Sequence, residues 1–165
     1  MTIIIKNKDT LIFDDFKFKC CVGKNGFTKN KLEGDGKTPR GVFGIEKLYF
    51  RHDKKEIPQT KLKLIRIKKY MGWCNDVKSE KHYNKLIKTN LNIKYENLFR
   101  TDYKYDFLIP IKQNWFNPVS GGGSAIFIHL TKNYKPTAGC IALSKKDFLV
   151  LIKLINKNTK IRILK

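Results

Sequence analysis

Residues Ser124 to Leu143 read SAIFIHLTKNYKPTAGCIAL, and the rest of the chain is interpreted from them. The segment opens with the apolar run Ala125 to Ile128, which predicts a buried β-strand because glycines precede it. His129 follows at the expected end of that strand. Cys140 comes at the next turn, between Gly139 and a second apolar run. The segment therefore predicts that a histidine and a cysteine face one another across a short loop.

This pair of side chains has two interpretations. A thiol is a poor nucleophile at neutral pH until a base or a positive neighbour favours the thiolate, and His129 would supply that base. Gly139 would let the backbone turn tightly, so that N–H groups point at a developing oxyanion. However, a buried cysteine is usually an inert small hydrophobe, and a lone histidine at a strand end is usually structural. The pair alone leaves both interpretations open.

Two motifs in this order carry a resemblance to a known family. The first is His129 followed by the run 137–140, Thr-Ala-Gly-Cys; the second is Lys24-Asn25-Gly26 followed by Lys31 to Gly41, KLEGDGKTPRG. Together they resemble the signature of the YkuD-type L,D-transpeptidase catalytic domain, in its branch with a TAGC motif, over roughly residues 20–145. One position departs from the commoner pattern: Ala142 stands where many members carry arginine, which leaves open how substrate carboxylates are held.

The resemblance implies an enzyme, a peptidoglycan L,D-transpeptidase. Cys140 would form a thioester with a tetrapeptide stem and release its terminal D-Ala, and His129 would move the proton. Backbone N–H groups of Ala138, Gly139 and Cys140 would stabilise the oxyanion. An amine acceptor would then take the acyl group. This chemistry needs no metal and no cofactor.

The substrate-binding residues are expected on three segments. Thr137 belongs to the cysteine motif. Trp73 and Asp76 lie in a segment that resembles a further pattern of this branch, and they either line the substrate groove or serve as a packing aromatic and a turn acid. Gly122, Gly123 and Ser124 lead into the catalytic strand, where they either let a substrate backbone pass closely or form a hinge.

Two further functions compete with transfer. A carboxypeptidase or amide hydrolase on the same Cys–His scaffold would differ only in using water as the second acceptor, which no sequence feature fixes. A non-catalytic basic module would bind anionic polymer in a strongly salt-dependent way, with Cys140 inert.

The charge balance points to an anionic partner without naming one. The chain has 165 residues, with 35 Lys and Arg against 14 Asp and Glu, and a formal net charge of +21. The basic residues are scattered, and no basic run is interleaved with aromatics as in nucleic-acid motifs. Nucleic acid is therefore not expected, and anionic envelope polymers stay open as partners. Peptidoglycan stems are the partners that the family resemblance implies.

The sequence gives conflicting indications of the cellular compartment in which the protein acts. No apolar run of about 18 residues predicts a membrane span, and the first residues lack the pattern of a signal peptide. Cys20, Cys21, Cys74 and Cys140 show no paired spacing for disulfides or zinc, which favours a reducing compartment. Family resemblance instead implies the cell envelope. The cytoplasm, another export route or a missing leader all stay open.

The strand patterns predict one mostly-β domain over residues 1–165, a sandwich or open barrel of mixed sheets with about two short helices. One helix is expected from Ser79, with Tyr83, Leu86 and Ile87 on its apolar face, and one from Ser144, with an apolar stripe. The glycine-rich segment 23–41 is expected to frame the site. The remaining predicted strands are 2–5, 10–13, 16–22, 42–50, 61–68, 107–111 and 160–164.

Overall fold

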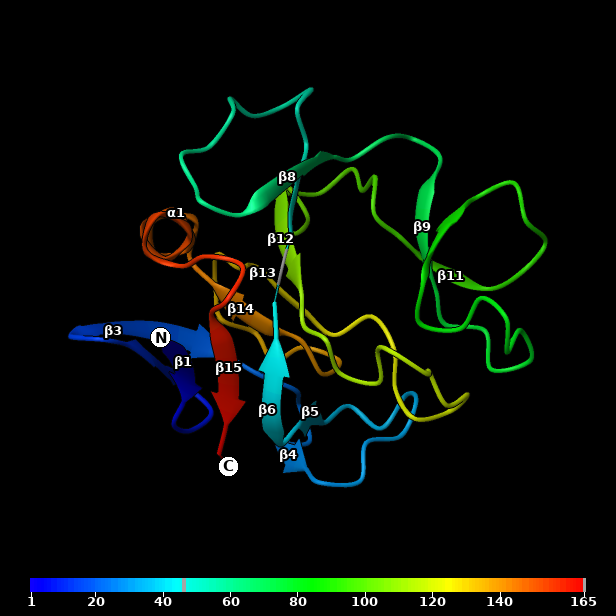
Figure 1. Ribbon diagram of the computed structural model, residues 1–165, viewed down its shortest axis with the longest axis horizontal. Coiled ribbons are helices and arrows are strands. Elements are labelled where there is room, and N and C mark those ends of the chain that lie inside the picture. The colour runs from blue at the N-terminus through cyan, green and yellow to red at the C-terminus, as the bar shows by residue number, and fades with distance from the viewer. Residues whose placement is uncertain (46, 165) are drawn as a thin grey trace.

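The computed structural model describes residues 1–45 and 47–164, and its regular structure is mostly β-strand (Figure 1). In chain order the elements are β1 (Thr2–Ile5), β2 (Thr10–Phe13), β3 (Phe16–Cys21), β4 (Phe27–Thr28), β5 (Thr38–Pro39), β6 (Gly41–Gly44), β7 (Lys47–Phe50), β8 (Lys63–Arg66), β9 (Met71–Cys74), β10 (Leu86–Lys88), β11 (Tyr95–Asn97), β12 (Phe107–Pro110), β13 (Phe127–Leu130), β14 (Ile141–Leu143), α1 (Lys145–Leu154) and β15 (Lys160–Ile163).

Within the described ranges, ten strands form one sheet in the order β6-β15-β1-β2-β3-β14-β13-β12-β7-β8. The pairs β1–β15, β13–β14 and β7–β8 are parallel, and the other neighbours are antiparallel. A three-stranded sheet, β10-β9-β11, forms a separate lobe at the right of Figure 1, and β4 pairs with β5. The mostly-β prediction with mixed sheets is confirmed.

The central strands β13 and β14 alternate between two faces, as the two-residue period of a strand requires. Ile128 and Leu130 of β13, with Ile141 and Leu143 of β14, enter the main apolar core. Phe127, directly before Ile128, and Cys140, directly before Ile141, face the other way and join a second, smaller cluster. Alternation therefore gives this part of the sheet one face towards the main core and one face towards the second cluster.

Helix α1 covers the main core beside the sheet. The Ser144 side chain accepts a hydrogen bond from the backbone N–H of Asp147 at 3.1 Å, which caps the helix start. The predicted apolar stripe is buried against the core and consists of Phe148, Leu151, Ile152 and Ile155. The helix expected from Ser144 is confirmed.

The prediction of a helix from Ser79 is wrong. Among the residues described, α1 is the one α-helix. The carbonyl of Ser79 accepts from the N–H groups of His82 and Tyr83, which makes a single turn. Asn84 then takes a φ of 54°, in the left-handed region, and this ends the turn. Leu86 to Lys88 consequently form β10 and pair with β9.

Two strand predictions shift as well. The strand predicted from Ala125 begins at Phe127 instead, because Ala125 has a φ of 53° and stands outside the sheet. His129 therefore lies inside β13, not at its end. The predicted strand 42–50 is two strands, β6 and β7, and residue 46 between them is outside the described part of the chain.

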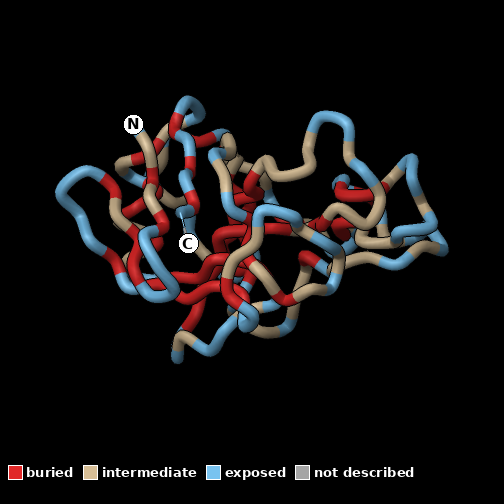
Figure 2. Tube along the Cα trace, turned by 90° about the horizontal axis from the view of Figure 1, so that it is seen from below, coloured by how far each residue is buried: buried red, intermediate tan, exposed pale blue. Residues whose placement is uncertain are grey.

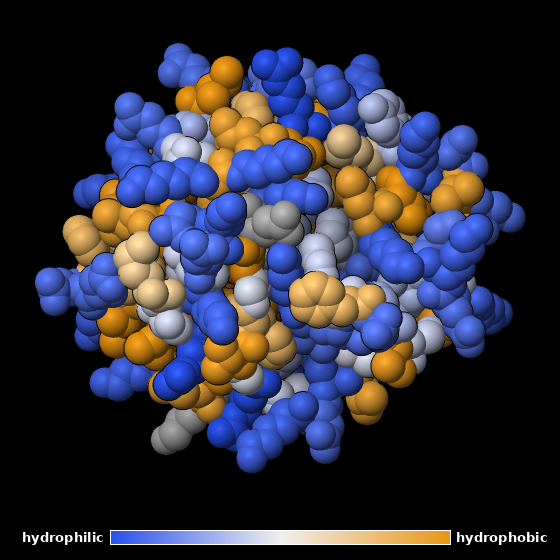
Figure 3. Space-filling view, viewed as in Figure 1, coloured by the Kyte–Doolittle hydropathy of each residue, from blue (hydrophilic) through white to orange (hydrophobic). Residues whose placement is uncertain are grey.

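Burial follows this layout. Figure 2 shows buried segments gathered in the middle of the trace, whereas the lobe of β9 to β11 is mostly intermediate or exposed. The face seen in Figure 3 carries hydrophilic side chains over most of its rim, with smaller apolar patches between them.

Candidate active site

A cleft of about 550 Å³ opens on the face of β13 and β14 that points away from the main core. His129 and Cys140 both line it. In the parallel register His129 lies opposite Ala142, two residues beyond Cys140, so the histidine and the cysteine share one face of neighbouring strands. The structure thus brings the two sequence-predicted residues together. They make no hydrogen bond with each other; each is held by backbone groups.

The Cys140 thiol is fixed by the segment before β13. Its S–H donates to the carbonyl of Ala125 at 3.3 Å, and its Sγ accepts from the N–H of Phe127 at 3.4 Å. Burial raises the thiol pKa to about 12, while the Phe127 N–H and the charge of Lys31 act in the opposite direction. The resting side chain is therefore a protonated thiol that needs a base.

His129 has the form that a general base needs. Its Nδ1 lies 3.0 Å from the carbonyl of Leu130, and because a carbonyl only accepts, Nδ1 carries the proton and Nε2 is the free base. Burial lowers the imidazole pKa to about 4, so the ring is neutral at pH 7. The Tyr105 ring packs edge-on against it at 5.4 Å. The orienting partner of His129 is thus a backbone carbonyl.

The turn before Cys140 is closed by Thr137. Its hydroxyl donates to the Cys140 carbonyl at 2.6 Å and accepts from the Gly139 N–H at 3.1 Å. Thr137 and Ala138 also line the cleft, as expected. Since the Gly139 N–H is already bonded, we assign the proposed oxyanion donors to the N–H groups of Ala138 and Cys140.

The glycine-rich segment 23–41 packs against this turn. The Thr38 hydroxyl donates to the Gly139 carbonyl at 2.9 Å and accepts from the Gly23 N–H at 2.8 Å. Gly139 has a φ of 147°, and a Cβ there would meet the Lys37 carbonyl oxygen at 2.9 Å. The segment frames the cleft, as expected, and its close approach requires glycine beside Cys140.

Ser124 is hydrogen-bonded to a carboxylate at the wall of the cleft. Its hydroxyl donates to Glu33 Oε2 at 2.6 Å, and the Tyr83 hydroxyl donates to the same oxygen. Ser124 and Glu33 both line the cleft, and Tyr83 is fully buried behind them. This network ties the glycine-rich segment to the strand that precedes Cys140.

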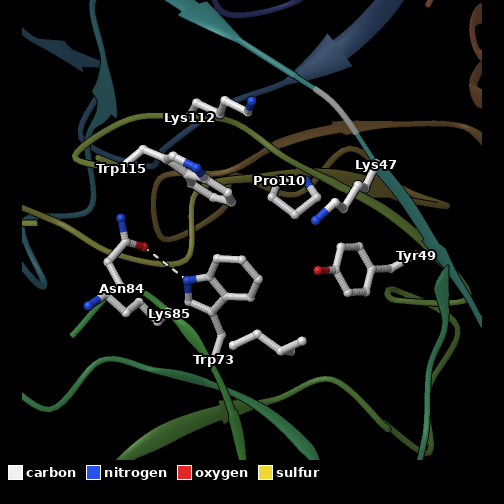
Figure 4. A pocket seen from close by; sticks show the side chains of 9 residues that line it. Lys47, Tyr49, Trp73, Asn84, Lys85, Pro110, Lys112 and Trp115 are labelled. Carbon is white, nitrogen blue, oxygen red and sulfur yellow. Dashed lines mark hydrogen bonds between the residues drawn. The ribbon is translucent and has the colours of Figure 1, made fainter. Parts of the chain in front are cut away.

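Trp73 does not line this cleft. It lines a second cavity of about 270 Å³, together with Tyr49, Pro110 and Trp115, and we call this the aromatic cavity (Figure 4). Its indole N–H donates to Asn84 Oδ1 at 2.9 Å, the bond drawn in Figure 4. The packing interpretation of Trp73 therefore describes its place better than a groove wall does.

Three other predicted binding residues also lie off the cleft wall. Asp76 accepts backbone N–H bonds from Lys78 and Lys94, which lower its carboxyl pKa, so it is a turn acid. Gly122 and Gly123 lie beside other chain segments: a Cβ on Gly123 would come within 2.5 Å of Lys31 Cγ. Close packing against neighbouring segments accounts for these glycines.

The cleft contains charged residues that sequence reasoning did not select. Lys31, Glu96 and Arg100 line it, and Arg100 is ion-paired with Glu96 at 3.3 Å. These residues are far from Cys140 in the sequence, so no local motif indicates that they lie beside it. Because basic residues are scattered along the whole chain, composition does not single them out either. Among the residues described, no group of three or more His, Cys, Asp or Glu side chains is placed to hold a metal ion.

The fold and the site define a class: a mostly-β protein whose buried Cys–His pair opens to a cleft, as in enzymes that use a cysteine nucleophile. The family model of the L,D-transpeptidase catalytic domain, YkuD, matches residues 1–163, and the chain belongs to this family. A comparison with curated proteins found no match. No helix in the described ranges is long and apolar enough to cross a membrane.

Proposed function

We propose that the chain is a peptidoglycan L,D-transpeptidase that works through a thioester on Cys140. The observation that carries this proposal is that His129, in β13, and Cys140, directly before the parallel neighbour β14, lie on one face at the wall of a 550 Å³ cleft. Membership of the YkuD family supports the choice of a peptidoglycan stem as the substrate. Such a substrate implies action at the cell envelope.

The acylation step follows from the tautomer of His129. Nε2 takes the Cys140 proton as Sγ bonds to the carbonyl carbon of the third stem residue. The N–H groups of Ala138 and Cys140 stabilise the tetrahedral oxyanion, at roughly 3 kcal/mol for a well-placed donor. When the C–N bond breaks, His129 returns the proton to the amine of the departing D-Ala.

Deacylation repeats the steps with a different nucleophile. An acceptor amine attacks the thioester carbonyl, gives its proton through His129 to the leaving Cys140 sulfur, and forms a new amide. Water in place of the amine would release the free tripeptide acid, as a carboxypeptidase does. The neutral resting pair suits this cycle because charge separates only during reaction, between two side chains that are both buried.

The test is an intact-protein mass spectrum after incubation with a disaccharide-tetrapeptide. We expect the wild type to gain the mass of the acyl group that remains after loss of D-Ala, and Cys140→Ala to gain nothing. Adding an amine acceptor then separates transfer from hydrolysis by the product formed. If the wild type forms no adduct and releases no D-Ala across pH 5 to 9, the proposal is wrong.

A basic binding module is the alternative that the net charge of +21 supports. Such a module would bind anionic polymer equally well as wild type and as Cys140→Ala, with affinity that falls steeply with salt. Binding without any acyl adduct would favour this function.

A further inference from the structure

The glycine-rich segment brings one buried cation beside the nucleophile. The Lys31 side chain is 6% exposed, which is unusual for lysine, and it lines the same cleft as Cys140. Its ammonium is ion-paired with Asp35 and donates to the Leu32 carbonyl at 2.9 Å. A buried lysine normally has such partners, so the ion pair by itself assigns no role.

The position of Lys31 goes beyond that pairing. A Cβ placed on Gly139 would lie 3.6 Å from Lys31 Nζ, and one placed on Gly123 would lie 2.5 Å from Lys31 Cγ. The lysine stem therefore runs against Gly123, and its charged end reaches Gly139 in the turn that carries Cys140. Both glycines have positive φ, of 88° and 147°, and leave room for this side chain.

The negative charge of the reaction develops at this turn. It appears first on Cys140 Sγ, when His129 takes the proton, and then on the carbonyl oxygen of the tetrahedral intermediate. Of the charged groups that act on the Cys140 thiol, Lys31 favours its ionised form, whereas Glu96 opposes it, as would ionisation of the neighbouring Cys21. Tyr105 also interacts with Cys140 and is buried, with its pKa well above the usual range.

We propose that Lys31 is the cation that stabilises this developing negative charge, on Cys140 Sγ and on the substrate oxygen that bonds near it. The part that concerns the substrate oxygen rests on the proposed function; the part that concerns the thiol does not. Lys31 exchanges no proton and forms no bond with the substrate. It acts by charge from a site of low dielectric, where a fixed ammonium has more effect than in water.

The first test uses iodoacetamide, which needs no substrate. Cys140 Sγ displaces iodide from this reagent as the thiolate, so the rate against pH follows ionisation of the thiol. Peptide mapping assigns the label to Cys140 rather than to Cys20, Cys21 or Cys74, which are also free. We expect Lys31→Met to lower the rate about tenfold at a fixed pH and to move the profile to higher pH, corresponding to about one pKa unit. Lys31→Arg keeps the charge and should restore most of the rate.

A second variant separates charge from structure. Asp35→Asn leaves Lys31 charged but removes its neutralising carboxylate, so we expect alkylation to stay equal or to become faster. If Lys31 only holds the segment in shape, breaking the ion pair from either side should have the same effect. Slower alkylation in both variants, or no change in Lys31→Met, would overturn the proposal. Should Lys31→Met fail to fold, slower alkylation in Asp35→Asn decides against it.

A matched control removes a lysine from another ion pair. Lys55 Nζ lies 3.1 Å from Asp106 Oδ2, and Lys55 does not line the cleft. Lys55→Met should leave the alkylation profile unchanged. With the disaccharide-tetrapeptide, Lys31→Met should lower kcat more than it raises KM, because the charge it stabilises is greatest in the transition state. If the wild type is never acylated by this substrate, only the statement about the substrate oxygen is lost, and the alkylation test still decides the role at the thiol.

Discussion

The cleft and the aromatic cavity differ in their lining, yet one layer of residues joins them. The cleft is lined by a thiol, an imidazole and charged groups of both signs, whereas the aromatic cavity is lined by Trp73, Trp115 and Tyr49 together with lysines. Trp73 packs edge-on against Phe127 at 5.4 Å, and the N–H of Phe127 bonds to Cys140 Sγ.

Asn84 makes the second connection between the two regions. Its Oδ1 accepts hydrogen bonds from the Trp73 indole N–H and from the N–H of Ala125, the latter at 3.1 Å, and the Ala125 carbonyl accepts a hydrogen bond from the Cys140 thiol. The comparison teaches that aromatic packing beside one region positions the backbone groups that bind the Cys140 thiol in the other.

The largest effect is expected where the cleft loses its nucleophile. Cys140→Ala should reduce acyl-adduct formation by on the order of 10³-fold or more, because no other group can take the acyl. Cys20→Ala is the matched control: this thiol is also buried but lies in the main core, and adduct formation should persist. Mass spectrometry of both variants checks the prediction. An adduct that survives in Cys140→Ala would move the chemistry to another residue.

The layer between the two regions should be the next most sensitive. Asn84→Ala removes bonds to Trp73 and Ala125 and to the carbonyls of Gln113 and Asn114, so we expect a loss of about 3 kcal/mol in the free energy of unfolding. Asn84→Gly should cost about 1 kcal/mol less, because glycine adopts the positive φ without strain. Urea titrations measure both. Equal losses would show that the left-handed backbone contributes nothing.

The two regions should also differ in their response to acid. The folded pKa of His129, about 4, lies below its ordinary value of 6.5, so the unfolded chain binds the proton more readily. Its contribution is fully present above pH 6.5 and is lost as the pH falls towards 4. We expect the difference in unfolding free energy between wild type and His129→Gln to shrink by roughly 2 kcal/mol from pH 7.5 to pH 5. Parallel pH curves for the two proteins would contradict this.

The smallest effects should come from the open side of the aromatic cavity. Trp115 is half-buried, so Trp115→Phe should change the free energy of unfolding by less than about 1 kcal/mol and the acylation rate by less than about twofold. Trp73 is then the sole tryptophan, and at 2% exposure its emission should resist quenching by acrylamide. Strong quenching in this variant would show that the layer opens in solution.

Local sequence patterns account for most of the fold. Short apolar runs located β1 and β2, alternating apolar residues located β3, and the Ser144 cap located α1, because each depends on neighbours in the chain. His129 and Cys140 were selected by their motifs and by the loop predicted between them; both line the cleft, and their catalytic role stays a prediction.

Long-range packing accounts for what the sequence did not predict. Asn84 interrupts an apolar pattern of helical spacing by taking a left-handed conformation and bonding to residues 29 and 30 positions away. The indole of Trp73 is held by the same residue. The contact of Lys31 with Gly139 depends on a crossing of two loops more than a hundred residues apart, which no local pattern encodes.

The parallel pairing of β1 with β15 also determines when the molecule can be completed during synthesis. β15 lies between β6 and β1, so both of these strands keep an unpaired edge until residues 160–163 have left the ribosome. Unpaired strand edges are sites of intermolecular association. The nascent chain therefore carries these open edges until β15 emerges, and we expect its tendency to associate with other chains to fall once β15 has paired with β1 and β6.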